Sequence, residues 1–341
     1  MNFFYKHLLS ISVVLFTVLF FLAFLYIDLT GVMFLATKEG LNVILGLFKR
    51  AWFLLIPDLL LIPLMIYLLV LYIKSEKSFK KWIIIPSVIV FELLYTFVVS
   101  MYFMAPGFSF YPCDYNSIVL SYNNVSQVSV TYKNQRYSST YYDNGFDKVS
   151  IMFLGNGMVS SDVFEFIGEE NLELSERNLL VMDYPYFSSN PGRLTEKTIY
   201  DLVDLHMDKL LNEYGYSLKD IRVIGYSIGT GVACYCAEKY DVSELVLFAP
   251  YYKFQDAMNR VTPVFYGPLE LCVRFKFESY KRAPNIKCMT TIIYSDSDKV
   301  ITESSTQALI SCFNNKEVVK YHDYTHTMVF RNDDTINYLL H

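Results

Sequence analysis

Several common functional signatures are missing from this 341-residue chain. It contains no Gly-Lys-Ser or Gly-Lys-Thr, and therefore no phosphate-binding loop of that kind. Its six cysteines show neither C-x-x-C metal spacing nor the density of a disulfide framework. The net charge is only −5 and no long run of one sign occurs, which gives no reason to expect a nucleic-acid partner.

Glycine is scarce, and this makes one short glycine motif informative. Residues 225–229 read Gly-Tyr-Ser-Ile-Gly and fit G-x-S-x-G, in which the serine sits on a sharp turn between a strand and a helix. With 14 glycines and 28 serines in 341 positions, chance supplies roughly 0.05 such matches. Ser227 is thus a candidate nucleophile, and the alternative is that these small residues only allow a helix to pack closely on a sheet.

Hydrophobic residues make up 53% of the chain, more than is usual in soluble proteins, and they are concentrated at the front. Three apolar stretches, at about 8–29, 51–73 and 82–105, are each long enough to span a bilayer. The first is longer than a signal-peptide core and no cleavage site follows it, which favours an uncleaved anchor. Residues 31–48 are interrupted by Lys38 and Glu39 and predict an interfacial helix, with a fourth span as the alternative.

The pattern therefore predicts a transmembrane module at 1–110 and a second domain at 111–341. Residues 74–81 carry four lysines and one glutamate, which favours a cytoplasmic loop and an extracytoplasmic second domain. Lys38, Lys49 and Arg50 weaken this bias, and the unpatterned cysteines favour a reducing compartment, so the opposite orientation stays open. The expected location is the cell membrane, as a multi-pass protein.

Two acidic residues fall inside the second and third predicted spans. Asp58 lies near one end of its span and Glu92 lies near the middle. Because carboxylates are costly inside a bilayer, both are candidates for a function, although Asp58 is also explained if it reaches the interface.

The second half of the chain alternates between apolar runs of strand length and helical segments. Residues 117–142 predict an antiparallel ribbon, and residues 195–215 predict a helix capped by Thr195. The predicted strands are 149–155, 178–184, 220–226, 244–250, 289–295 and 317–322. This alternation predicts an α/β fold with a mostly parallel sheet, whose ligands bind beyond the carboxyl ends of the strands.

A nucleophilic serine needs a histidine to accept its proton and a carboxylate to orient that histidine. Three histidines follow Ser227: His322, His326 and His341. His326 is favoured because it lies in a loop just beyond a predicted strand. The acid is Asp296 or Asp298, which both follow the strand at 289–295, and Asp298 is preferred.

The oxyanion of an acyl-transfer reaction needs main-chain donors. One is expected from the residue after the nucleophile, Ile228, and another from the loop after an earlier strand. The sequence Leu-Gly-Asn-Gly-Met at 154–158 suits that loop, with Asn156 or Gly157 as the donor. An ordinary glycine turn is the alternative.

These features resemble the α/β-hydrolase family, in particular its membrane-anchored serine hydrolases that act on acyl esters and thioesters. The likeness covers about 147–340 and includes the elbow, VMDYPYFSSNPGRLTE at 181–196, IIYSDSDKVI at 292–301 and YTHTM at 324–328. The resemblance implies an α/β-hydrolase fold with a short cap insertion at about 251–287, and it aligns Asp298 and His326 with the family's catalytic acid and base. Leu154, Pro185-Tyr186 and Tyr294-Ser295 depart from the family's pattern.

Together these observations predict a membrane-anchored serine hydrolase that cleaves lipid-derived acyl esters or thioesters through Ser227, Asp298 and His326. The lipid bilayer and the acyl substrate are the expected partners, and no metal or organic cofactor is expected. A non-catalytic receptor or scaffold with a hydrolase fold, and a serine peptidase on the same fold, are the alternatives.

Overall fold

The computed structural model describes residues 110 and 113–340 apart from 170–175, 189, 193 and 262, together with scattered positions between 53 and 102. Contacts divide the chain into two units, Met1–Phe108 and Ser109–His341. Among the described positions, no helix combines the length and apolarity needed to cross a bilayer. The predicted spans fall mostly outside these positions, and the interfacial helix, Asp58 and Glu92 lie outside them altogether, so these features stay predictions.

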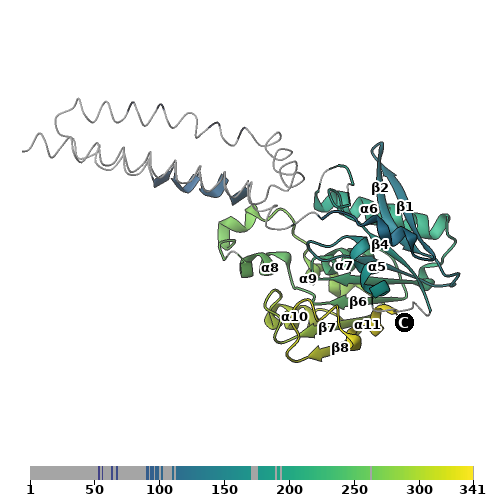
Figure 1. Ribbon diagram of the computed structural model, residues 1–341. Coiled ribbons are helices and arrows are strands. Elements are labelled where there is room, and N and C mark those ends of the chain that lie inside the picture. The colour runs from purple at the N-terminus through teal and green to yellow at the C-terminus, as the bar shows by residue number, and fades with distance from the viewer. Residues whose placement is uncertain are drawn as a thin grey trace, which may run out of the picture. The chain divides into compact units, whose positions relative to one another are not determined.

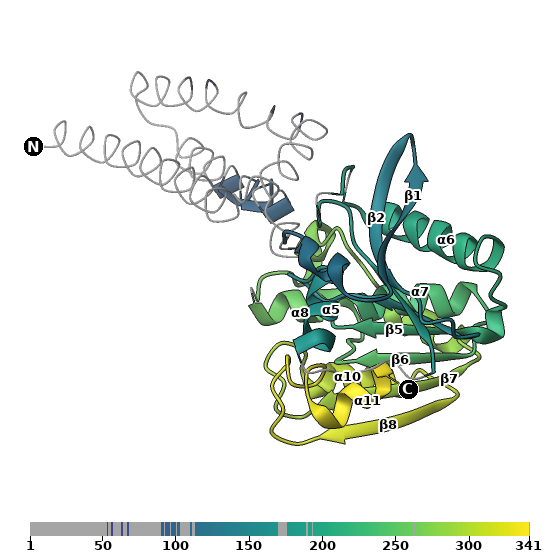
Figure 2. The same ribbon diagram turned by 45° about the vertical axis from the view of Figure 1, so that its right-hand side comes forward.

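The second unit is built on an eight-stranded sheet with the order β1-β2-β4-β3-β5-β6-β7-β8. β1 pairs antiparallel with β2, and β2 with β4, while every pair from β4 across to β8 is parallel (Figure 2). The strands are β1 Val125–Tyr132, β2 Gln135–Tyr142, β3 Val149–Phe153, β4 Asn178–Met182, β5 Ile221–Tyr226, β6 Glu244–Phe248, β7 Met289–Ser295 and β8 Lys316–Tyr321. The predicted mostly parallel sheet is confirmed.

Helices lie in each interval along the chain from β3 to β8, and others precede β1 and follow β8. They are α5 Ser160–Glu169, α6 Glu196–Asn212, α7 Gly229–Lys239, α8 Phe254–Val261, α9 Ser279–Arg282, α10 Glu303–Ile310 and α11 Asp333–Leu340, with short 3-10 helices η2 Ser117–Ser121, η3 Leu218–Asp220, η4 Gly267–Cys272 and η5 Ala283–Asn285. Thr195 caps α6 as predicted, because its side chain accepts a hydrogen bond from Thr198 N. Residues 117–121, predicted as part of the ribbon, instead form η2, whose first turn is capped by the Asn116 side chain.

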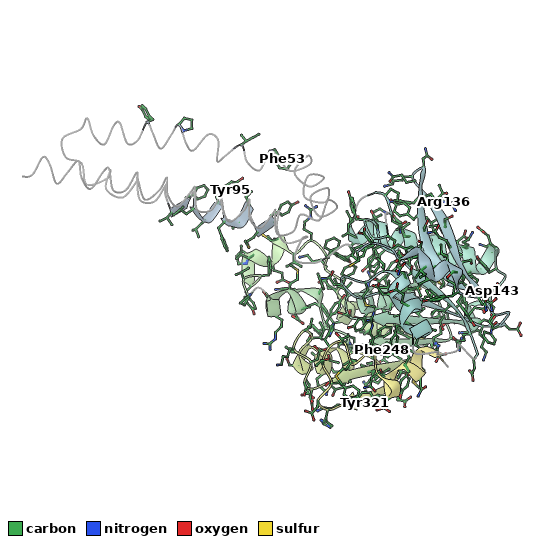
Figure 3. The ribbon with its side chains drawn as sticks, viewed as in Figure 1. Phe53, Tyr95, Arg136, Asp143, Phe248 and Tyr321 are labelled. Carbon is green, nitrogen blue, oxygen red and sulfur yellow. The ribbon has the colours of Figure 1, made fainter. Side chains whose placement is uncertain are left out.

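The hydrophobic core lies on both sides of the central strands. β3, β4 and β5 are buried along their whole length. Figure 1 shows helices packed against both faces of the sheet, and α7 contacts β3, β5 and β6 as well as its neighbours α6 and α9. In Figure 3, Phe248 at the end of β6 lies deep among the side chains, in agreement with its complete burial.

The chain order places several loops at one edge of the sheet. From β3 the chain moves outward to β4, and then returns to β5 on the other side of β3. Such a reversal leaves a crevice beyond the carboxyl ends of the two central strands, where α/β proteins bind ligands. The loops that follow β3, β5, β7 and β8 all begin at this edge, and they carry every residue predicted for the site.

One longer insertion separates β6 from β7. It contains α8, η4, α9 and η5 and falls in the range predicted for the cap, 251–287.

Candidate active site

Ser227 lies in the turn between β5 and α7, in the left-handed region of backbone conformation. Its φ is +51°, which costs a non-glycine residue on the order of 1 kcal/mol. The turn is held by three hydrogen bonds: Ser227 N donates to Phe248 O at 2.9 Å, and Ser227 O accepts from Thr230 N at 3.0 Å and Thr230 Oγ1 at 2.6 Å. The turn therefore places Ser227 between the end of β5 and the start of α7, outside both elements.

The glycines of the motif permit the close approach of α7 to the sheet. A Cβ on Gly229 would lie 2.1 Å from the carbonyl oxygen of Phe153, and a Cβ on Gly225 would lie 2.7 Å from the Cβ of Ala233. No side chain fits at those distances. The close packing of α7 and the strained turn at Ser227 therefore occur together. The glycines are explained by packing, and this does not argue against Ser227 as a candidate nucleophile.

The structure brings Ser227, His326 and Asp298 into one hydrogen-bonded chain. The Ser227 hydroxyl lies 2.9 Å from His326 Nε2, and His326 Nδ1 lies 2.7 Å from Asp298 Oδ2. Because an ionised carboxylate only accepts, Nδ1 carries the proton and Nε2 is the acceptor that faces the serine. The remaining oxygen of Asp298 accepts from Val300 N at 2.7 Å and Ile301 N at 2.9 Å, which fixes the carboxylate.

The competing acid and base pair with each other instead. His322 Nδ1 lies 2.5 Å from Asp296 Oδ2, and Lys320 lies 3.2 Å from the same oxygen. The His322 side chain is 72% exposed, against 17% for His326. His341 lies outside the described residues. Of the two candidate histidines that the structure describes, only His326 bonds to both an aspartate and Ser227.

Tyr226 supports the histidine, a role that sequence reasoning did not foresee. Its ring stacks on His326 with 5.3 Å between centroids, and its hydroxyl donates to His326 O at 3.2 Å. The Tyr226 ring also stacks on Phe330, with 4.9 Å between centroids. The tyrosine lies inside the G-x-S-x-G motif, where the pattern accepts any residue, so the motif carries no signal for it.

A pocket of about 580 Å³ opens over the serine and the histidine. It is lined by Asn156, Gly157, Met158, Asp162, Glu165, Phe166, Tyr226, Ser227, Val300, His326, Thr327, Phe330 and Arg331. Apolar side chains thus share the walls with two carboxylates and one guanidinium, and burial raises the pKa of Asp162. These three charges come from α5 and the segment before α11, and no sequence motif marked them.

The predicted oxyanion donors lie around this pocket. Asn156 and Gly157 line it, and Gly157 has a φ of +67° that glycine adopts without strain. Ile228 directly follows the serine and precedes α7, where the first N–H groups of a helix have no acceptor within the helix. This placement suits both main-chain donors, and their role stays a prediction.

Asp183 and Tyr184 hold the loop that carries Asn156 and Gly157. Tyr184 Oη donates to Leu154 O at 3.0 Å, at the start of the loop. At its end, the Asp183 carboxylate accepts from both the main-chain N and the hydroxyl of Ser160, each at 2.6 Å. Asp183 and Tyr184 belong to the segment 181–196 that resembles the family, and the sequence assigns them no role. In the structure they bond to the two ends of the loop.

Asp183 is also a strongly perturbed acid. Burial raises its pKa from 3.8 to about 6, although the hydrogen bonds from Ser160 act in the opposite direction. An acid whose pKa is raised on folding stabilises the protein most below its unfolded pKa, and that contribution is lost as the pH rises through the folded pKa.

We therefore expect Asp183→Asn, which cannot ionise, to flatten the pH dependence of stability. Between pH 4 and pH 8, the unfolding free energy of the wild type should fall by about 2 kcal/mol more than that of the variant. Urea unfolding followed by circular dichroism at the two pH values measures this difference. Parallel pH profiles for the two proteins would show that Asp183 is not the group that titrates.

His206, by contrast, belongs to the core. Burial lowers its pKa to about 4, so it is neutral at pH 7. Its Nδ1 lies 2.8 Å from Leu202 O, and its Nε2 lies 2.9 Å from Ser139 Oγ. Within the described part of the chain, no three His, Cys, Asp or Glu side chains gather as metal ligands. The expectation that no metal or cofactor is needed stays a prediction.

Known proteins that are similar to this chain are named as hydrolases or have a hydrolase structure. No protein-family model matches the chain. The protein L404 of Acanthamoeba polyphaga mimivirus, provisionally named an alpha/beta hydrolase, is 28% identical over 179 residues, which are 52% of this chain and 65% of that protein. The alpha/beta hydrolase domain-containing protein aho-3 of Caenorhabditis elegans is 28% identical over 124 residues, 36% of each chain. The matched region is thus less than two thirds of the length of either relative.

A solved structure extends the likeness to three dimensions. The Pyrococcus furiosus esterase Pf2001 superposes with a TM-score of 0.52 at 21% identity, over 67% of this chain and 92% of that chain. At this identity the likeness shows the fold alone. The chain has the α/β-hydrolase fold, and both curated relatives carry α/β-hydrolase names.

Proposed function

We propose that this protein is a serine hydrolase that cleaves acyl esters or thioesters through Ser227, His326 and Asp298. The observation that carries the proposal is the continuous chain of hydrogen bonds from Ser227 Oγ through the imidazole to Asp298, at 2.9 and 2.7 Å. The names of the relatives, which describe hydrolases, and the esterase among the structural neighbours agree with it. A receptor or scaffold has no need of all three groups in this order.

The geometry supports an acyl-enzyme mechanism. Ser227 Oγ attacks the carbonyl carbon of the substrate while His326 Nε2 takes the hydroxyl proton. The N–H groups of Ile228 and of Asn156 or Gly157 stabilise the oxyanion that forms. The imidazolium then gives its proton to the departing alcohol or thiol, leaving the acyl group on Ser227. His326 next takes a proton from water, the resulting hydroxide attacks the acyl carbon, and the acid is released as Ser227 recovers its proton.

We propose lipid-derived acyl groups as the substrates, because the predicted anchor holds the site near a bilayer. The walls of the pocket combine apolar and charged side chains, which suits a substrate that has both an apolar and a polar part. Met158, Phe166, Val300 and Phe330 suit an acyl chain, while Asp162, Glu165 and Arg331 suit a polar leaving group.

The substrate class is tested with the full chain in lipid vesicles. We expect hydrolysis of both a long-chain oxoester and its thioester analogue, and no cleavage of an internally quenched peptide, because an alkoxide or thiolate leaves more readily than an amide nitrogen. A Ser227→Ala preparation is the matched blank. Cleavage of the peptide in preference to both esters would replace the esterase proposal by the peptidase alternative.

We further propose that the protein is anchored in the cell membrane with the hydrolase domain outside the cytoplasm. The support is the basic loop at 74–81 and the predicted span at 82–105 that follows it. An alkaline phosphatase fused after Tyr115 should be active, and a fluorescent protein that folds only in the cytosol should be dark there. The reverse pair of signals would place the site in the cytoplasm and direct the substrate search to cytosolic thioesters and lipidated proteins.

A further inference from the structure

The insertion between β6 and β7 presents two large apolar side chains to solvent. We name residues 263–271, which follow α8 (Figure 1), the cap tip. Within it, Leu271 is 80% exposed and Tyr266 is 60% exposed. No other large hydrophobic residue described in the second unit is as exposed as Leu271. A single exposed leucine needs no explanation, but a leucine and a tyrosine on one tip form a candidate contact surface.

The cap tip is held firmly on both sides of these residues. Before Tyr266, Phe265 is fully buried, and its main chain bonds to two side chains of α8: Phe265 N donates to Asn259 Oδ1 at 2.8 Å, and Phe265 O accepts from Asn259 and from Gln255. After Leu271, Cys272 and Val273 are buried again. The exposure of the two apolar side chains is therefore imposed by the anchored chain on either side.

The surroundings of the cap tip carry positive charge. Residues 253–276 contain four basic and two acidic side chains, a net charge of +2 in a chain whose total is −5. Both acids are engaged: Glu270 pairs with Lys253 at 3.5 Å, and Asp256 accepts from Ser305 Oγ at 2.9 Å. An apolar tip with a tyrosine and basic neighbours is the combination that binds the interface of a membrane with anionic lipids.

Phe110, the first described residue after the predicted third span, lies close to the base of the cap tip. Phe110 is buried, and its ring lies 4.6 Å from that of Phe275, three residues after η4 ends. The span is predicted to end at residue 105, so only four residues lie between it and Phe110. The five residue steps from 105 to 110 cover at most about 18 Å when fully extended. If that span is anchored as proposed, the same bilayer surface is within a short distance of the cap.

We propose that the cap tip inserts Tyr266 and Leu271 into the headgroup region of an anionic bilayer, and thereby fixes the orientation of the hydrolase domain on the membrane. This inference rests on the proposed membrane anchoring. It is separate from the chemistry at Ser227, since neither side chain lines the catalytic pocket.

The insertion is measured by tryptophan quenching in the full chain. The native tryptophans, Trp52 and Trp82, are replaced by phenylalanine, and Leu271→Trp provides the probe. Val318→Trp is the matched control, because Val318 is 42% exposed on the edge strand β8. The vesicles contain phosphatidylcholine and phosphatidylglycerol, with bromine on the upper acyl carbons.

A tip that lies about 5–10 Å deep at the headgroup boundary predicts a blue-shifted Leu271→Trp emission that brominated lipid quenches, and a Val318→Trp emission that it leaves unchanged. Equal quenching of the two probes, or none at Leu271→Trp, would overturn the proposal.

A second measurement uses the unmodified tryptophan background. The double variant Tyr266→Asp and Leu271→Asp should lose hydrolysis of a long-chain ester dissolved in vesicles while it keeps hydrolysis of water-soluble p-nitrophenyl butyrate. Equal loss of both activities, or loss of neither, would argue against docking by the tip. If the wild type cleaves no ester at all, the proposed function fails, and the quenching result still decides the position of the tip.

Discussion

Replacing Ser227 by alanine should lower the hydrolysis of a p-nitrophenyl ester by a factor on the order of 10⁴ to 10⁶. The Ser227 hydroxyl is the proposed nucleophile of the hydrogen-bonded chain, in which His326 and Asp298 move and stabilise the proton. The substitution removes one oxygen and leaves the main-chain bonds of the turn intact, so the domain should stay folded.

The measurement is the steady-state rate of purified wild type and variant at pH 8, with circular dichroism to confirm the fold. Ser297→Ala is a suitable control, since Ser297 is an exposed serine on the loop that carries Asp298. The control should keep the wild-type rate. An unchanged rate in Ser227→Ala would contradict the proposed nucleophile.

Replacing Asp298 by asparagine should lower kcat by about 10⁴-fold. Asp298 accepts a hydrogen bond from His326 Nδ1 and two from the main chain, at Val300 and Ile301. The two main-chain bonds hold one oxygen, so the amide nitrogen of asparagine would face His326 Nδ1. That nitrogen is a donor, and it would favour the tautomer with the proton on Nε2, which cannot take the proton of Ser227.

Asp296→Asn is the matched comparison, because it makes the same chemical change two residues away. Asp296 pairs with the exposed His322 and with Lys320, and such surface pairs contribute little. The Asp296→Asn substitution should therefore change kcat by no more than about twofold. If the larger loss followed Asp296→Asn, the catalytic acid would be Asp296 and the distances to His326 would have no functional meaning.

Much of the second unit could be predicted from local sequence, because its strands are short apolar runs separated by clear turns. The six predicted strands all exist, although β3, β4 and β6 end two residues earlier than the apolar runs suggested. The runs continue because the residues beyond the strands, such as Leu154, Tyr184 and Ala249, are buried at the edge of the site. Hydrophobicity reports burial, and burial does not stop where strand pairing stops.

Some residues of the site could be identified from a local motif, and others could be assigned only from the structure. Ser227 could be found from its motif, since the turn requires glycines at fixed offsets. The spacing alone left Asp296 and Asp298 open, and the structure separates them by their partners: one aspartate meets the buried histidine and the other meets the exposed one. That separation depends on how two distant loops meet.

The supports of the site lay beyond sequence reasoning. Asp183 and Ser160 are 23 residues apart, and Tyr184 reaches back 30 residues to Leu154. Their contacts arise from the pairing of β3 with β4, which no local pattern states. The charged side chains of the pocket were missed for the same reason, since Asp162 and Arg331 are brought together only by the fold.

The most direct test of the central claim is covalent labelling with a fluorophosphonate. This reagent transfers a phosphonyl group to an activated serine hydroxyl as fluoride leaves, and it stops at the tetrahedral adduct. Digestion and mass spectrometry of the labelled full chain should place a single adduct on the peptide that contains Ser227, with none in Ser227→Ala. An adduct on another serine, or no adduct on folded wild-type protein, would contradict the account.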